Sequence, residues 1–192
     1  MVNGLLVVNN VGIAAEHLMP FLHMEERVIS SMMKVNMFPC TMLTRAFLPS
    51  MKRRRKGAII NISSVARLQP LPYITVYSAT KHFIHAFTEA LAQETSGTGV
   101  TIQEVNPGEV ETSLTKHLPR SRFSPRASPD EYAKSALSTL TYSSVTCGWW
   151  PHELQVLLWC CLPTGLRTVL TRKALEHTYS TIMAKLSRSR DE

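Results

Sequence analysis

Short strand-like runs that end in polar or turn-forming residues constrain the fold of this chain most strongly. Gly4–Val8 is a continuous apolar run, Ala58–Ile62 predicts a second buried strand, and Val100–Val105 predicts a third short strand before a Pro-Gly turn. Apolar runs of this length are typical of strands buried on both faces of a parallel sheet. Segments with helical spacing separate them, so the sequence predicts an α/β fold with right-handed crossovers.

Three segments are predicted to be helical before the C-terminal region. Residues 25–54 have helical character with an expected boundary near Asn36 and Pro39, and residues 76–95 carry apolar side chains at helical spacing. A third helix is expected to begin at Ser128, an N-cap residue followed by proline. About the last 25 residues are expected to form a basic helix.

The net charge of the chain is +7, but most of its basic residues are scattered. The one dense run, Lys52–Lys56, falls where a helix should end, and cations suit that end of a helix dipole. A basic run alone is weak evidence for nucleic-acid binding, so we expect no nucleic-acid partner. The four cysteines have no metal-ligand spacing, and we expect no metal site.

Residues 149–175 combine three tryptophans, a leucine-rich stretch and then cations. This pattern is typical of a helix that lies on a membrane surface, although a helix packed on the domain would carry it too. The sequence has no apolar stretch of about 20 residues, the length that a spanning helix needs.

Three predicted strand ends carry polar or turn residues. In chain order they are Asn10 with Gly12, Ser63 with Ser64, and Pro107 with Gly108. Open α/β sheets bind ligands at the carboxyl ends of their strands, so these residues are predicted to border one site.

Tyr77 and Lys81 are four residues apart at the start of the predicted 76–95 helix, so they share a helix face. A cation beside a tyrosine favours the phenolate and lowers the tyrosine pKa. The pair therefore suits a general acid that protonates a carbonyl oxygen, and a nearby serine could bind the same oxygen. Simpler interpretations stay open: Asn36 could cap a helix, Ser64 could merely end a strand, and Asn10 and Gly12 could serve only a turn.

The ordered set of motifs resembles the short-chain dehydrogenase/reductase family. The matching elements are Asn9-Asn10-Val11-Gly12, Asn36, Ile59–Ser64, Tyr77-Ser78-Ala79-Thr80-Lys81 and Pro107–Thr112. Ser64 precedes Tyr77 by thirteen residues and Asn36 precedes Ser64 by twenty-eight, as in the family's Asn-Ser-Tyr-Lys tetrad. Thr146-Cys147-Gly148 with His152-Glu153 is similar to the branch of microsomal 17-beta-hydroxysteroid dehydrogenases and very-long-chain 3-oxoacyl-CoA reductases.

This resemblance implies a role for each catalytic residue. Tyr77 would donate a proton to the substrate oxygen, and Ser64 would hydrogen-bond that oxygen. Lys81 would lower the Tyr77 pKa and hold the nicotinamide ribose, while Asn36 would position a water that links Lys81 to solvent.

The resemblance also implies which residues contact an NADP(H) cofactor. The cofactor-binding positions are Asn10, Gly12, Tyr77, Lys81, Pro107, Gly108, Val110 and Thr112. Asn10 and Gly12 would line the adenosine side, and Thr112 would bind the nicotinamide carboxamide.

The sequence contains no glycine-rich phosphate-binding motif of the kind that opens dinucleotide-binding folds. We therefore expect the C-terminal part of a doubly wound parallel Rossmann-type sheet, with the first three strands missing. Residues 1–142 would form the catalytic half of the domain and residues 143–192 a helical extension of it.

The expected function is an NADP(H)-linked oxidoreductase acting on a steroid or fatty acyl-CoA ketone or alcohol. Its activity in this chain is expected to be impaired by loss of the cofactor-binding half. The alternative is a non-catalytic remnant that binds a lipid or a partner protein. The resemblance implies a location at the cytosolic face of the endoplasmic reticulum membrane, and it leaves membrane-surface contact and a homodimer open.

Overall fold

The computed structural model of this chain describes residues 5–116, 124–140 and 142–188. The described helices, including short 3-10 turns labelled η, and strands follow in this order: β1 (Leu5–Asn9), η1 (Phe21–His23), α1 (Glu26–Arg54), β2 (Gly57–Ile62), η2 (Val65–Arg67), α2 (Thr75–Glu94), β3 (Val100–Val105), β4 (Glu109–Val110), β5 (Arg126–Ala127), α3 (Pro129–Ser138), β6 (Val145–Thr146), α4 (Trp150–Cys160) and α5 (Thr164–Arg188).

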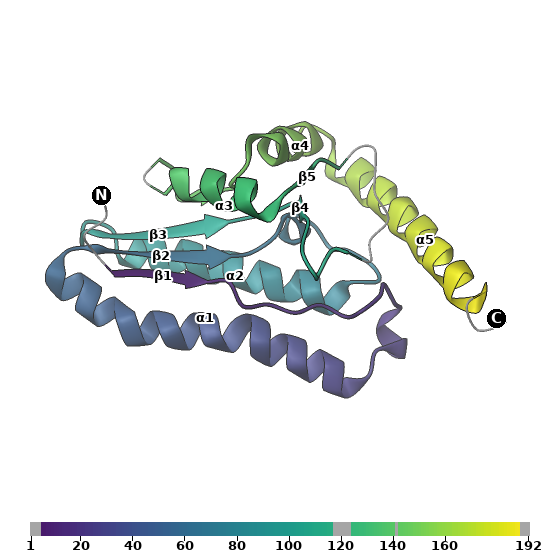
Figure 1. Ribbon diagram of the computed structural model, residues 1–192, viewed down its shortest axis with the longest axis horizontal. Coiled ribbons are helices and arrows are strands. Elements are labelled where there is room, and N and C mark those ends of the chain that lie inside the picture. Colours follow the sequence, from purple (N-terminus) through teal and green to yellow (C-terminus); the bar gives the residue numbers. More distant parts are fainter. Residues whose placement is uncertain (1–4, 117–123, 141, 189–192) are drawn as a thin grey trace.

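The main sheet is parallel, as predicted, with the strand order β1-β2-β3-β6. Figure 1 shows α1 and α2 along one side of this sheet and α3 with α4 on the other. Strand β6 follows residue 142 and pairs with the end of β3, so the sheet continues into the segment expected to be a helical extension.

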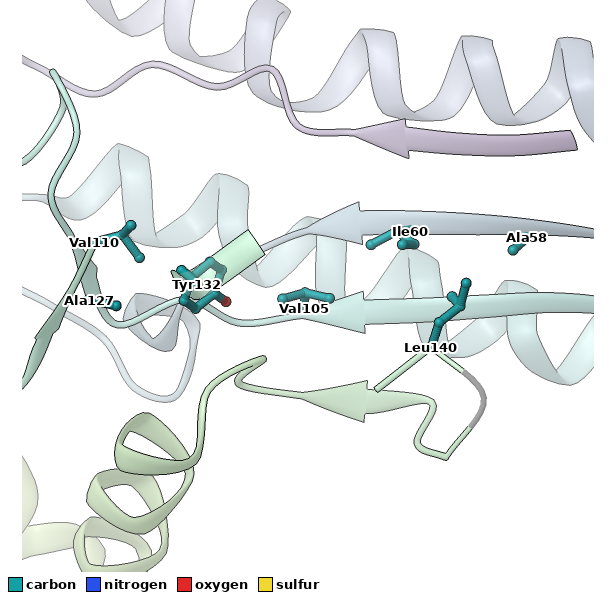
Figure 2. Close-up of a cluster of buried hydrophobic side chains, with 7 residues drawn as sticks. All are labelled: Ala58, Ile60, Val105, Val110, Ala127, Tyr132 and Leu140. Carbon is teal, nitrogen blue, oxygen red and sulfur yellow. The ribbon is translucent and has the colours of Figure 1, made fainter. Parts of the chain in front are cut away.

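Alternation along the strands divides the core into two layers. Val7 of β1 aligns with Ile59 of β2, and that row packs with Ile102 against α1 and α2. The neighbouring positions Ala58 and Ile60 face the other way. They join the cluster drawn in Figure 2, which α3 and the β4–β5 pair complete.

Strand β1 differs from the prediction of a strand buried on both faces. Its Val7 is buried, but Leu6 and Val8 are 41% and 46% exposed. These two side chains share a sheet face with Ala58 and Ile60 of β2, which are buried. Strand β2 lies inside the described sheet, whereas β1 lies at its edge. Gly4, with which the predicted strand begins, lies outside the described residues.

Helix α1 corrects the boundary expected near Asn36 and Pro39, because it runs unbroken from Glu26 to Arg54 with both residues inside it. Its buried residues Met32, Asn36, Cys40 and Thr44 recur every four positions. This buried face packs on α2 and the sheet, and that packing outweighs the helix-breaking tendency of proline. The basic run ends the helix as predicted, with Arg55 in the left-handed C-cap conformation.

The remaining predictions of secondary structure agree closely with the structure. Helix α2 and strand β3 occupy the predicted segments, and the Ser128 hydroxyl accepts a hydrogen bond from the Glu131 amide at the start of α3. None of the described helices is by itself long and apolar enough to span a bilayer. Helices α4 and α5 meet the length and hydropathy criteria only when taken together, and they are bent by 119°.

Candidate active site

Tyr77 and Lys81 lie on one face of the first turns of α2, beside the carboxyl end of β2. The Lys81 ammonium is 5.7 Å from the centroid of the Tyr77 ring and donates a hydrogen bond to the Ile62 carbonyl at 3.0 Å. Lys81 is only 5% exposed, and this burial lowers its pKa to about 8. The lysine is therefore held in place by a strand-end carbonyl, and with a pKa of about 8 it is still mostly protonated at pH 7.

Ser64 follows β2 and caps η2 by accepting a hydrogen bond from the Ala66 amide at 3.1 Å. The Ser64 side chain also lowers the pKa of Tyr77 through a hydrogen bond, so the two hydroxyl groups lie near each other. The Ser64 hydroxyl lies 3.5 Å from the Pro107 carbonyl, which further links this residue to the end of β3.

The Tyr77 pKa departs from the expected direction. Tyr77 packs against an apolar cluster that includes Met24 and Met32, and burial raises its pKa. The hydrogen bond with Ser64 lowers the pKa by a smaller amount. The prediction that Lys81 lowers the Tyr77 pKa is not supported, because the ammonium lies over the ring and is bonded to Ile62. Tyr77 is therefore protonated at neutral pH and can act as a proton donor.

Asn36 lies inside α1, which rules out the interpretation that it caps a helix. Its side-chain oxygen accepts a hydrogen bond from the Ile13 amide at 2.7 Å. Its side-chain nitrogen donates to the Ile13 carbonyl at 2.9 Å and to the Thr80 hydroxyl at 3.0 Å. Asn36 thus joins the loop after β1 to helices α1 and α2.

Gly12 lies where this loop approaches Lys81. A Cβ atom at Gly12 would be 3.3 Å from the Lys81 ammonium and 3.6 Å from the Asn36 side-chain oxygen. The loop therefore packs closely on Lys81 at this position, and a side chain larger than that of glycine would crowd the ammonium. Asn10, the other residue predicted here, is exposed.

The Pro107–Thr112 segment is only partly assembled as predicted. The Pro107 carbonyl accepts a hydrogen bond from the Val65 amide at 3.0 Å, which ties the segment to η2. Val110 is buried in the core shown in Figure 2, so it could reach a cofactor only through its backbone. Thr112 is exposed, and its amide donates to the Thr115 hydroxyl.

Sequence reasoning missed two buried polar groups next to this site. His152 accepts a hydrogen bond from the Gly108 amide, although the two residues are 44 positions apart. Glu104, fully buried on β3, pairs with Arg67 at 2.8 Å and with His85 at 2.7 Å. A glutamate inside a short predicted strand was the available signal for the second group.

The residues present fit one part of a nicotinamide cofactor. Lys81 and Asn36 offer an ammonium and a side-chain amide beside Gly12, groups that could bind a ribose hydroxyl, and Tyr77 and Ser64 lie nearby. Among the described residues, no group of three or more His, Cys, Asp or Glu side chains is arranged to hold a metal ion.

Comparisons with known proteins match this geometry. Residues 2–122 match the family described as short chain dehydrogenase. A very-long-chain 3-oxoacyl-CoA reductase from Bos taurus is 37% identical over 163 residues, which are 84% of this chain and 52% of the relative. An inactive hydroxysteroid dehydrogenase-like protein 1 from Homo sapiens is 34% identical over 166 residues, covering 84% of this chain and 49% of the relative.

Among solved structures, a short chain dehydrogenase from Burkholderia cenocepacia in complex with NADP is similar, with a TM-score of 0.73 and 25% identity. The similarity covers 86% of this chain and 68% of that one. This chain spans about half the length of the curated relatives that it matches. The family match covers most of the chain and includes every residue of the Asn36-Ser64-Tyr77-Lys81 set, so the chain belongs to the short-chain dehydrogenase family.

Proposed function

We propose that this chain carries the proton-donating part of an NADP(H)-linked reductase that acts on a hydrophobic ketone, either a steroid or a fatty acyl-CoA. The observation that carries the proposal is the meeting of Ser64, Tyr77 and Lys81 at one end of the sheet. Relatives named as 3-oxoacyl-CoA reductase and hydroxysteroid dehydrogenase-like protein support the two substrate classes. The NADP complex of a related dehydrogenase supports the cofactor.

The chemistry divides among the three side chains. The Ser64 hydroxyl hydrogen-bonds the carbonyl oxygen of the substrate, and Tyr77 donates its phenolic proton to that oxygen. The raised Tyr77 pKa keeps this proton in place until negative charge develops on the oxygen. Lys81, held beside the Tyr77 ring by the Ile62 carbonyl, would hold the nicotinamide ribose of the cofactor. A bound nicotinamide cofactor supplies the hydride.

Lys81 and the backbone of Pro107–Val110 would hold the nicotinamide end of the cofactor, and Gly12 would line its adenosine side. The 192-residue sequence has no glycine-rich phosphate-binding turn. Such a turn, at a helix N-terminus, binds the pyrophosphate in dinucleotide-binding folds. We therefore expect this chain by itself to bind NADPH too weakly for saturation at micromolar concentrations.

A chimera tests the proposal. The N-terminal half of the bovine 3-oxoacyl-CoA reductase would be joined to this chain, and NADPH oxidation would be followed with a 3-oxoacyl-CoA and with a steroid ketone. We expect turnover with one of these substrates. A folded chimera that binds NADPH but reduces neither would contradict the proposed activity.

A second candidate is a non-catalytic protein that binds a lipid or a partner. It is favoured by the human relative named as inactive. The same chimera separates the two candidates, because a non-catalytic protein would bind substrate without oxidising NADPH.

We also propose that the protein works at an anionic membrane surface, in keeping with the expected location at the endoplasmic reticulum. Trp150, Leu154, Leu157 and Leu158 are 71%, 46%, 62% and 61% exposed and share one face of α4. Residues 154–175 contain three cations and no acidic residue, which complements anionic lipid headgroups.

Vesicle flotation tests this surface. The chain should float with vesicles containing phosphatidylserine, and replacing Leu157 and Leu158 with aspartate should abolish flotation. Leu22→Asp is the matched control, because Leu22 is 91% exposed elsewhere on the chain. Flotation that survives the double substitution would remove the proposed membrane surface.

A further inference from the structure

His152, in the first turn of α4, is fully buried between segments that are far apart in the sequence. Its ring contacts the Tyr132 ring of α3 and the Trp149 ring, with centroid distances of 5.8 Å and 4.9 Å. Its two ring nitrogens face the Gly108 amide and the Pro125 carbonyl. The histidine therefore stands where the turn after β3, the start of the β5 segment and α4 meet.

The two partners determine the tautomer of this imidazole. The Gly108 amide can only donate, so His152 Nδ1 must accept at 3.2 Å. The Pro125 carbonyl can only accept, so His152 Nε2 must carry the proton that it donates at 3.1 Å. Both nitrogens are satisfied only in the neutral Nε2–H form.

The turn fits closely against the ring. A Cβ atom at Gly108 would be 2.7 Å from His152 Cδ2 and 2.8 Å from Nε2. Because His152 is fully buried, its ring has no open space to move into. Position 108 therefore requires glycine, and this requirement arises from a residue 44 positions away.

We propose that neutral His152 is a positioning residue that holds the Pro107–Val110 backbone in the place needed for the nicotinamide end of the cofactor. This inference rests on the proposed function for the use of that segment. The hydrogen bond and the ring contact both act on Gly108, next to the Pro107 carbonyl that lies beside Ser64. His152 thus acts through the backbone and does not touch the reacting atoms.

Protonation of His152 would break this arrangement, because two N–H groups would then face each other at Gly108. The acidic groups that act on His152 are Glu109 of β4, which is paired with Arg126, and Glu153 of α4. Burial lowers the His152 pKa and outweighs the groups that favour the charged ring, which are the backbone hydrogen bonds of Pro125 and Glu109 and the charges of Glu109 and Glu153. The neutral form is therefore the folded form at neutral pH.

The sign of the pH dependence follows from this lowered pKa. Between the unfolded pKa of about 6.5 and the folded pKa, the unfolded state binds more protons than the folded state. The contribution of His152 to stability is therefore fully present above about pH 6.5 and is lost as the pH falls below that value.

Two substitutions in the full chain distinguish the contributions of the two ring nitrogens of His152. In His152→Asn the side-chain oxygen lies near the Nδ1 position and can still accept from the Gly108 amide. In His152→Gln the side-chain nitrogen lies near the Nε2 position and can still donate to the Pro125 carbonyl, but the acceptor for Gly108 is lost. Both variants lose the same ring packing, so a merely structural role predicts equal effects.

Amide hydrogen exchange at Gly108, followed by NMR at neutral pH, is the readout. We expect Gln to speed Gly108 exchange at least tenfold more than Asn does, with similar melting temperatures for the two variants. We also expect ¹⁵N shifts that identify the Nε2–H tautomer in the unsubstituted chain. Equal exchange in the two variants, or an Nδ1–H tautomer, would overturn the proposal.

The same variants in the chimera test the link to the cofactor. Gln should raise KM for NADPH at least fivefold more than Asn, with a smaller difference in kcat. An unchanged KM despite faster Gly108 exchange would overturn the positioning role. A chimera without NADPH oxidation in any form would count against the proposed function, while the exchange result would still decide the His152 contacts.

Discussion

Strands β1 and β3 differ in opposite ways in sequence and in environment. Strand β1 is almost entirely apolar, yet Leu6 and Val8 are substantially exposed at the sheet edge. Strand β3 contains Gln103 and Glu104, yet both are fully buried between β2 and β6. Position in the sheet therefore decides burial here, and hydropathy alone would rank the two strands in the wrong order.

The difference separates two ways of stabilising a strand. Glu104 is tolerated because the Arg67 guanidinium neutralises it and His85 Nδ1 hydrogen-bonds it. Gln103 donates to the Thr139 and Ser143 carbonyls at 2.9 and 2.8 Å. These contacts also fix the backbone that leads into Pro107. Strand β1 has no such polar support beyond Asn9, and one of its faces is only partly covered.

The largest expected effect on stability is at Glu104. Glu104→Ala should lower the free energy of unfolding by about 3–5 kcal/mol, because it leaves the Arg67 charge, whose side chain is only 13% exposed, without its carboxylate. Val8→Thr, which changes an exposed edge side chain of similar size, should cost less than about 1 kcal/mol. Urea unfolding of both variants checks the contrast. Equal losses would mean that β1 and β3 do not differ as described.

A smaller effect is expected at the turn after β3. Gly108→Ala should lower the free energy of unfolding by about 1–3 kcal/mol, because the added methyl group overpacks the His152 ring. Gly165→Ala in α5 is the control, since a Cβ there meets nothing within 4 Å. That substitution should be neutral or stabilise the helix. A stability loss at Gly165 as large as that at Gly108 would refute the tight packing around His152.

The smallest effect on stability is expected at the exposed edge. Val8→Lys should change the free energy of unfolding by less than about 1 kcal/mol but should reduce aggregation, because a charge on an edge strand discourages pairing with other chains. Light scattering at matched concentrations measures this effect. Unchanged aggregation would show that the chains do not aggregate through the β1 edge.

Short sequence patterns, such as apolar runs and helix-capping residues, predicted much of the fold. Apolar runs located β2, and the Ser128 cap located the start of α3. The proline rule failed in α1, because packing of its buried face outweighs the local preference for a break at Pro39. The burial of β1 was mispredicted because it depends on which strands lie beside it, and a short apolar run carries no such information.

The candidate site also has a part that could be predicted from the sequence and a part that could not. Tyr77 and Lys81 were found from their spacing on a helix, and Ser64 and Asn36 from the family resemblance. The structure places Ser64 and Lys81 beside Tyr77, and Asn36 near Lys81 on the other side of Gly12. His152 was missed because its partners, Gly108 and Pro125, are far from it in the sequence. The direction of the Tyr77 pKa shift was also wrong, since it depends on the apolar residues packed around the ring.

The central claim is that Tyr77 is the proton donor of a carbonyl-reducing site, and Tyr77→Phe in the chimera tests it most directly. The substitution removes only the phenolic oxygen, so turnover should fall by about 10²–10⁴-fold, the usual contribution of a general acid, while NADPH binding and melting temperature stay unchanged. Tyr73→Phe is the matched control, because Tyr73 stacks on Tyr179 and should keep full turnover. A Tyr77→Phe chimera that reduces the ketone as fast as the unsubstituted protein would contradict the account.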